Sequence, residues 1–213
     1  MTAHPTPQSY DGPDIPRPLG ENLRVALGLA ERPETFADWV DALFAVAARD
    51  DLAVGPDLLC TTEDSPYRAQ FDGRVQHYQC VQDPIILPFL ADDVDAVDID
   101  TASPLDGEPV RLRVTTEGID ADPSAVIVSV GVAADVDPPP ADGPSAITAY
   151  GNVCPYGHVF ADREEYERWA ETVDAHTMPT SIADTSELAR AIGAAAADDG
   201  EAASGAGTAR DVA

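Results

Sequence analysis

Hydrophobic residues recur at helical spacing near the start of the chain. Between Thr35 and Arg49 the large apolar side chains fall on one helix face, the pattern of a helix that packs against a core. These residues are Phe36, Trp39, Val40, Leu43, Phe44 and Ala47. Residues 21–31 also have a helical pattern. We therefore predict a small helical subdomain over residues 21–57.

Segments of biased composition stand on either side of the periodic region. Residues 1–20 contain five prolines, and residues 193–213 are rich in Ala, Gly and Asp without an apolar period. Both compositions are typical of segments that do not pack into a core. The sequence therefore predicts a disordered lead and a disordered tail. The proline-rich residues 135–144 predict a surface loop inside the domain.

A hairpin and a short apolar helix are predicted in the middle of the chain. Residues 67–80 contain two strand-like runs around Asp72-Gly73, a pair that favours a type I′ turn. The apolar run PIILPFL follows, with Asp83 at the expected N-cap and Pro84 at the first helical position. A further proline, Pro88, predicts that this helix is short or kinked.

Three strands are predicted over residues 94–99, 110–114 and 125–132. In the first two, apolar and polar residues alternate, as in a strand with one buried face. The third is almost continuously apolar, which indicates a central strand. Residues 146–153 are a candidate for one more strand.

Two helices complete the predicted fold. One begins at Asp162, with Glu165 placed as in a capping box and Trp169 on the buried face. The last is expected over residues 185–192. A helical lead followed by a mainly antiparallel sheet with packed helices is an α+β fold. We expect the main α+β domain to span residues 58–192.

The charge of the chain excludes some partners. Its 213 residues include 12 Lys+Arg, all of them Arg, against 39 Asp+Glu, for a formal net charge of −27. Such a surface repels phosphate backbones and anionic membranes, so neither nucleic acid nor a membrane is an expected partner. The sequence contains neither an apolar run of about 18 residues nor a signal-peptide pattern. We expect a cytoplasmic, halophilic protein whose acidic surface keeps it soluble in high salt.

Three cysteines are the candidates for chemistry. An odd, sparse number of cysteines in such a chain indicates metal binding, catalysis or buried thiols rather than a disulfide framework. Cys80 stands three residues before Asp83, and Cys154 four residues before His158. A helix N-terminus nearby favours a thiolate. Two thiolates suit a soft metal, and a neighbouring carboxylate adds a proton donor or acceptor.

Each candidate also has a plainer interpretation. A single cysteine is most often a small buried hydrophobe, and Asp83 would be explained equally well by capping alone. A histidine such as His158 is more often packed in the protein interior than bound to a metal. The role of His77 stays open, and for Cys60 we expect a structural or incidental role. Without a CxxC motif, a structural zinc site is poorly supported. These residues alone do not separate a metal site from buried thiols.

The order of three longer motifs adds information. FDGRVQHYQCVQDPIILPFL is followed by DGEPVRLRV and then by NVCPYGHVFADREEYERWA. Together they resemble the organomercurial lyase (alkylmercury lyase) family, in which a hairpin leads into Cys-x-x-Asp and an apolar helix. A Gly-x-Pro-Val strand and a second catalytic Cys before a Trp-bearing helix follow in that family. The resemblance covers about residues 67–192.

The resemblance implies a reaction and its residues. Cys80 and Cys154 match the two mercury-binding catalytic cysteines of the family, and Asp83 matches its catalytic aspartate, a further mercury ligand. The family cleaves the carbon–mercury bond of R–Hg⁺ by protonolysis, giving a hydrocarbon and Hg²⁺ without an organic cofactor. We expect external thiols, or a mercuric reductase, to accept the Hg²⁺. The expected walls of the substrate pocket are Ile85, Ile86, Phe89 and Phe160.

The chain departs from the family pattern at several positions. The family often has a Cys where this chain has Pro155, and another at about Ser103. One alternative to the lyase is a non-catalytic relative that uses Cys80 and Cys154 to bind or sense a soft metal such as mercury or copper. Another is a fold relative with buried cysteines and an unrelated interaction role. Asp83 discriminates between the first alternative and the lyase, because a protein that only binds metal needs no acid there.

Overall fold

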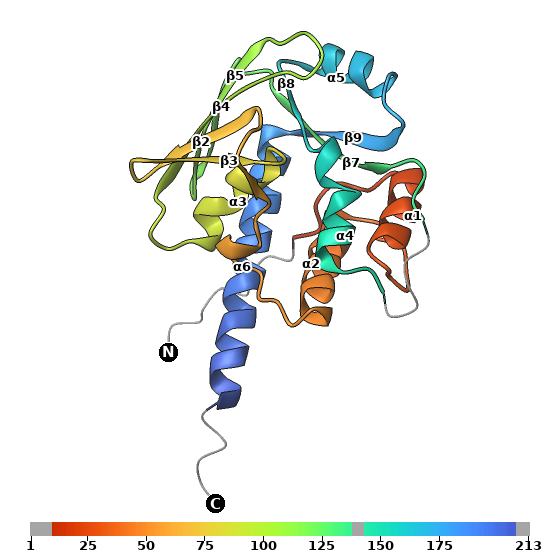
Figure 1. The fold of residues 1–213 in the computed structure, drawn as a ribbon, viewed down its shortest axis with the longest axis vertical. Coiled ribbons are helices and arrows are strands. Elements are labelled where there is room, and N and C mark those ends of the chain that lie inside the picture. The colour runs from red at the N-terminus through yellow and green to blue at the C-terminus, as the bar shows by residue number, and fades with distance from the viewer. Residues whose placement is uncertain (1–9, 138–142, 208–213) are drawn as a thin grey trace, which may run out of the picture.

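The structure, a computed structural model, describes residues 10–137 and 143–207 (Figure 1). It contains a helical N-terminal part, a six-stranded sheet, a three-stranded sheet and a long C-terminal helix. The neighbouring strands in both sheets are antiparallel. The predicted α+β fold is confirmed.

Two helices form the N-terminal part, α1 (Arg17–Ala26) and α2 (Phe36–Arg49). The predicted second helix is confirmed, and a capping box closes its start. Thr35 accepts a hydrogen bond from the Asp38 amide, while the Asp38 carboxylate accepts one from the Thr35 amide. This exchange satisfies two amides at the helix end that would otherwise lack partners.

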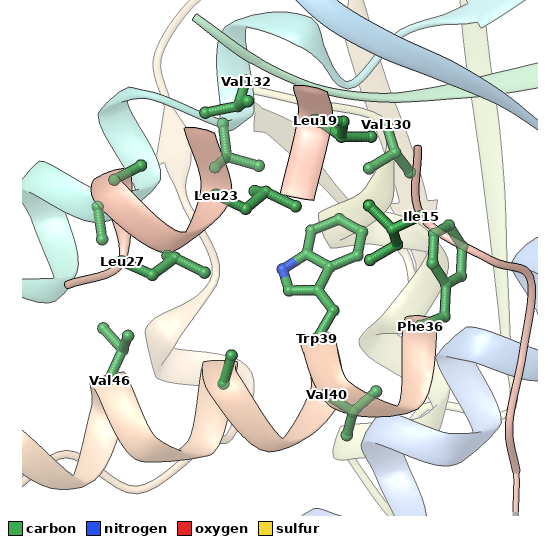
Figure 2. Packing of buried hydrophobic residues seen from close by; sticks show 14 of the residues in the cluster. Ile15, Leu19, Leu23, Leu27, Phe36, Trp39, Val40, Val46, Val130 and Val132 are labelled. Atoms are coloured by element: carbon green, nitrogen blue, oxygen red, sulfur yellow. The ribbon is translucent and has the colours of Figure 1, made fainter. Parts of the chain in front are cut away.

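The helical part shares its core with the rest of the molecule. Figure 2 shows the Trp39 indole of α2 next to Leu23 of α1 and Ile15. The same cluster includes Val130, from the three-stranded sheet, and Leu188, from the C-terminal helix. A boundary between residues 57 and 58 remains a prediction.

The disordered lead predicted for residues 1–20 is wrong for residues 10–20. Helix α1 begins at Arg17, and both Ile15 and Leu19 are buried. Proline is tolerated in the first turn of a helix, because the amides there have no partner within the helix. The apolar residues between the prolines therefore pack. Residues 1–9 lie outside the described part.

The six-stranded sheet has the order β1-β3-β2-β4-β5-β6. The predicted hairpin is confirmed, with positive φ at Asp72 (49°) and Gly73 (71°), as a type I′ turn requires. Strand β6, at one edge of this sheet, was not predicted, because its sequence GIDAD has little apolar character. The strands are β1 (Thr61–Thr62), β2 (Tyr67–Phe71), β3 (Arg74–Tyr78), β4 (Ala96–Ala102), β5 (Pro109–Thr115) and β6 (Gly118–Asp122).

The three-stranded sheet has β7 (Ile127–Ala133) between β8 (Val159–Phe160) and β9 (Ala175–Ser181). The predicted central strand is confirmed: β7 is buried along nearly its whole length. The edge strands β8 and β9 were not predicted. Helix α5 (Arg163–Ala170) begins after Asp162, whose side chain accepts a hydrogen bond from the Glu165 amide.

The strand expected over residues 146–153 is wrong, because helix α4 (Ala146–Gly151) occupies this segment. Two oxygens satisfy amides of its first turn. The Ser145 hydroxyl accepts a hydrogen bond from the Thr148 amide, and the Asp50 carboxylate accepts one from the Ala146 amide. Asp50 follows α2, so this second contact is not readable from the local sequence. Of the predicted loop over 135–144, residues 138–142 lie outside the described part.

Helix α3 (Gln82–Leu90) and the C-terminal helix α6 (Ile182–Gly207) pack against each other. Helix α6 runs down the middle of the molecule, and its last turns extend beyond the other elements (Figure 1). The disordered tail predicted from residue 193 is therefore wrong as far as Gly207, since its many alanines favour a helix. Residues 208–213 lie outside the described part. In the described residues, a helix that combines the length and apolar character needed to cross a membrane is not found.

Candidate active site

An apolar cavity of about 100 Å³ lies between α2, α3, α4 and α6. Three cysteines and one aspartate reach it: Cys60, Cys80, Asp83 and Cys154. The apolar part of its lining includes Trp39, Leu43, Ile85, Ile86, Leu90, Leu188 and Ile192. The three site residues expected from the family resemblance therefore meet in one cavity, and Cys60 joins them.

Cys80 is held where β3 ends and α3 begins. The amide of the next residue, Val81, donates a hydrogen bond to the carbonyl of Gly157, at 3.1 Å. A Cβ atom added to Gly157 would lie only 3.0 Å from the Cβ of Cys80. The glycine thus allows the loop that follows Cys154 to approach Cys80 closely.

Cys154 opens the 3-10 helix η2 (Cys154–Tyr156), directly after α4. Ser129 of β7 holds this loop: its hydroxyl donates to the Tyr156 carbonyl at 2.7 Å and accepts from the His158 amide at 2.9 Å. Hydrogen bonds to Cys60 and Cys80, together with burial, raise the pKa of the Cys154 thiol. This arrangement therefore favours Cys154 as a neutral thiol.

Asp83 does not cap α3, which corrects the sequence prediction. The helix begins one residue earlier, at Gln82, with Val81 in the cap position and without a side-chain cap. The Asp83 carboxylate instead accepts a hydrogen bond from the Cys60 amide, at 2.9 Å. Loss of solvent raises the pKa of Asp83 to about 6, although hydrogen bonds from the Cys60 amide and the Cys80 thiol oppose this shift.

Cys60 is the site residue that sequence reasoning placed elsewhere. It follows the 3-10 helix η1 (Pro56–Leu58), and its sulfur lies 4.0 Å from that of Cys154. The Cys154 thiol donates toward it, which lowers the pKa of Cys60. The Cys60 carbonyl accepts a hydrogen bond from the Gln79 amide, and β1 then pairs with β3. Only this pairing reveals the proximity, because no local motif surrounds Cys60.

His77, His158 and two of the expected pocket walls lie away from the cavity. His158 shares a hydrogen bond with the Tyr67 hydroxyl and packs edge-on against Trp169. Burial lowers the pKa of His158. His77 contacts the Ser65 carbonyl at 2.9 Å. Ile85 and Ile86 line the cavity as expected, whereas Phe89 and Phe160 do not. Phe160 packs with Tyr166 and Trp169 under α5, and Phe89 packs against Gly193 of α6.

Tyr150 of α4 is a second cavity residue that the sequence did not reveal. Burial and the neighbouring negative charges of Cys60 and Asp83 raise its pKa to about 12. Its phenol is therefore neutral at physiological pH and stands beside the acidic site as a hydrogen-bond donor.

All three cysteines are free thiols. Among residues 10–137 and 143–207, no three His, Cys, Asp or Glu side chains already converge as a ready-made metal ion site. Binding of one metal atom by several of these thiols therefore requires their side chains to rotate.

Comparison with known proteins bears on this cavity. Residues 60–193 match the family model described as alkylmercury lyase. The chain belongs to the alkylmercury lyase family. The matched range contains Cys60, Cys80, Asp83 and Cys154. The family assignment suggested by the three sequence motifs is therefore confirmed.

One solved structure that this alkylmercury lyase family chain resembles is the mercury-bound form of MerB2. The identity is 16% and the TM-score 0.46, over 82% of this chain and 97% of that chain. No curated protein matches the chain.

Proposed function

We propose that the protein cleaves the carbon–mercury bond of organomercurials, R–Hg⁺, by protonolysis and retains Hg²⁺ as the product. The observation that carries the proposal is the placement of the Asp83 carboxyl beside the thiols of Cys80 and Cys154 in one apolar cavity. Membership of the alkylmercury lyase family supports the same reaction.

In this proposal, Cys80 and Cys154 capture the mercury. Thiolates are the preferred protein ligands for soft metals. The two thiols lose two protons as two Hg–S bonds form; Asp83 accepts one proton, and the other leaves to solvent. The second sulfur raises the electron density at mercury and polarises the Hg–C bond toward carbanion character.

Asp83 then delivers its proton to carbon. The electron pair of the Hg–C bond becomes the new C–H bond, the carboxylate re-forms, and mercury remains as Hg²⁺ on two thiolates. Overall, R–Hg⁺ and two thiols give the hydrocarbon, the mercury bis-thiolate and one proton. A pKa of about 6 allows Asp83 both to take a proton and to return it near neutral pH.

The apolar walls of the cavity explain how an uncharged organic group is accommodated. Ile85, Ile86 and Leu188 offer contact to the group R, and their apolar surface gives water few hydrogen-bond partners. Exclusion of water strengthens the electrostatic effect of the carboxyl on the reacting atoms. The proposed reaction uses no organic cofactor, and external thiols or a mercuric reductase would remove the Hg²⁺.

Release of hydrocarbon tests this proposal. The purified protein is incubated with phenylmercury and excess thiol in molar KCl, and benzene is measured by gas chromatography. We expect benzene from the wild type but only background amounts from Cys80→Ala, Cys154→Ala and Asp83→Asn. Asp92→Asn is the matched control, because this exposed aspartate lies after the end of α3.

The same assay separates the lyase from a metal-binding relative. Asp83→Asn is expected to retain mercury while it releases no benzene. A wild-type protein that holds mercury tightly but forms no benzene would overturn the proposal in favour of binding or sensing.

A further inference from the structure

The two-cysteine reaction leaves the third thiol of the cavity without a role. Cys60 lies in contact with two of the three residues that the reaction uses. Its sulfur is 4.0 Å from the sulfur of Cys154, and its amide donates to the Asp83 carboxylate at 2.9 Å. Both contacts place Cys60 in the site itself rather than on the surrounding surface.

The separation of the two sulfurs has a specific chemical meaning. A disulfide bond needs about 2.05 Å, so 4.0 Å is the distance of two free thiols. At the zinc–sulfur bond length of about 2.3 Å, two sulfurs bound to one three-coordinate metal are about 4 Å apart. The spacing of the Cys60 and Cys154 sulfurs is therefore close to that of two ligands of one soft metal atom.

We propose that Cys60 is a third mercury-binding residue, and that Hg²⁺ left by the reaction is held by the sulfurs of Cys60, Cys80 and Cys154 together. This inference rests on the proposed function, since it concerns the product of that reaction. It assigns a ligand outside the Cys-x-x-Asp and second-Cys motifs.

Formation of the third bond balances without any redox change. The Cys60 thiol gives its proton to the Asp83 carboxylate, which has just lost its own proton to the hydrocarbon. The Cys60 sulfur then bonds to mercury, whose oxidation state stays at two. Because the three sulfurs do not yet converge, their side chains rotate about χ1 on binding. The Cys60 main chain stays fixed by its hydrogen bonds to Asp83 and Gln79.

The exposure of the three cysteines suggests how mercury leaves. Cys80 and Cys154 expose only 2% and 7% of their surface, whereas Cys60 is half-buried. Bonding to Cys60 therefore brings the metal to the sulfur nearest to solvent, where an external thiol can attack it.

X-ray absorption spectroscopy on the intact protein tests the inference. The wild type and Cys60→Ser are loaded with one equivalent of inorganic Hg²⁺ in molar potassium nitrate, which avoids competition by chloride. We expect three sulfur neighbours around mercury in the wild type and two in Cys60→Ser. Two sulfur neighbours in both proteins would overturn the inference.

An affinity measurement supplies a second readout. In competition with a small dithiol, Cys60→Ser is expected to bind Hg²⁺ at least about tenfold more weakly than the wild type. Equal affinity would contradict the inference. Thr61→Ser, at the next exposed position, is the matched control, and circular dichroism in the same salt verifies that each variant is folded.

The use of inorganic mercury separates this inference from the proposed function. Three sulfur neighbours in a protein that forms no benzene would leave the Cys60 assignment intact and remove the lyase. Benzene formation with two sulfur neighbours would do the opposite.

Discussion

The carboxylate of Asp83 accepts a hydrogen bond from the main-chain amide of Cys60, at 2.9 Å. This contact joins the first turn of α3 to the segment just before β1, so a residue with a motif and a residue without one become parts of the same site. It also keeps the carboxyl turned into an apolar cavity, where its ionised form is poorly solvated.

Asp83→Asn is expected to stabilise the protein at neutral pH. The folded-state pKa of about 6 exceeds the ordinary value of 3.8, so the fold favours the protonated carboxyl. The destabilisation caused by ionising the buried Asp83 is absent below about pH 4, grows as the pH rises to about 6 and is constant above. It reaches at most about 3 kcal/mol. Chemical denaturation of both proteins between pH 4 and 8 measures the difference, and a pH-independent difference would contradict this assignment.

The activity is expected to fall on the acid side of about pH 6. The free enzyme needs an ionised Asp83 to accept the first thiol proton, and protonation below its pKa removes this acceptor. Benzene formation at low phenylmercury concentration, measured from pH 4.5 to 8, gives the profile of kcat/KM. A profile without a break near pH 6 would show that another group controls the reaction.

Gly157→Ala is expected to impair the active site by steric overlap with Cys80 and not by backbone strain. The added Cβ would lie 3.0 Å from the Cβ of Cys80, and the φ of Gly157, −90°, is one that alanine adopts freely. A shift of the Cys80 loop by a fraction of an ångström is expected to lower kcat/KM by about tenfold or more.

The control for this loop variant is Gly151→Ala, because a Cβ there meets no other atom within 4 Å. It should leave the activity unchanged, and because Gly151 ends α4, alanine should leave the free energy of unfolding equal or raise it by up to about 1 kcal/mol. Equal effects of the two substitutions would argue against a close approach at Gly157.

Gly193→Ala is expected to destabilise the fold although it lies in a helix. Alanine favours a helix over glycine by about 1 kcal/mol. At this position, however, the new Cβ would come within 2.6 Å of the Phe89 carbonyl oxygen and 2.7 Å of its Cβ. Overpacking between α3 and α6 of this kind costs about 1–3 kcal/mol. A thermal melt in molar KCl measures the balance, and a raised midpoint would show that helix propensity dominates.

The thermal stability is expected to rise with salt concentration. A net charge of −27 makes the folded state repel itself, and ions screen this repulsion. Melting midpoints in KCl between about 0.1 M, where the screening length is about 10 Å, and 2 M provide the measurement. A midpoint independent of salt would contradict the predicted adaptation to high salt.

The sequence by itself determined the local parts of this protein. The apolar stripe of α2, the Asp72-Gly73 hairpin and the buried strand β7 each depend on neighbouring residues, and the structure has all three. The close pairing of Cys80 with Asp83 is local too, because only two residues separate them, just before and within the first turn of α3. The order of the motifs was enough to indicate the family.

Tertiary structure alone decided the rest. The Asp50 carboxylate, distant in sequence, accepts a hydrogen bond from the first amide of helix α4. Helix α6 packs against α3, and Gly193, in the segment expected to be disordered, lies against Phe89. Likewise, the pairing of β1 with β3 brings Cys60 to the same cavity as Asp83, and the hydrogen bonds of Ser129 hold the loop after Cys154 there. The physical reason is common to all of them: periodicity and turn chemistry act over a few residues, whereas these contacts join segments that only the completed sheets and packed helices bring together.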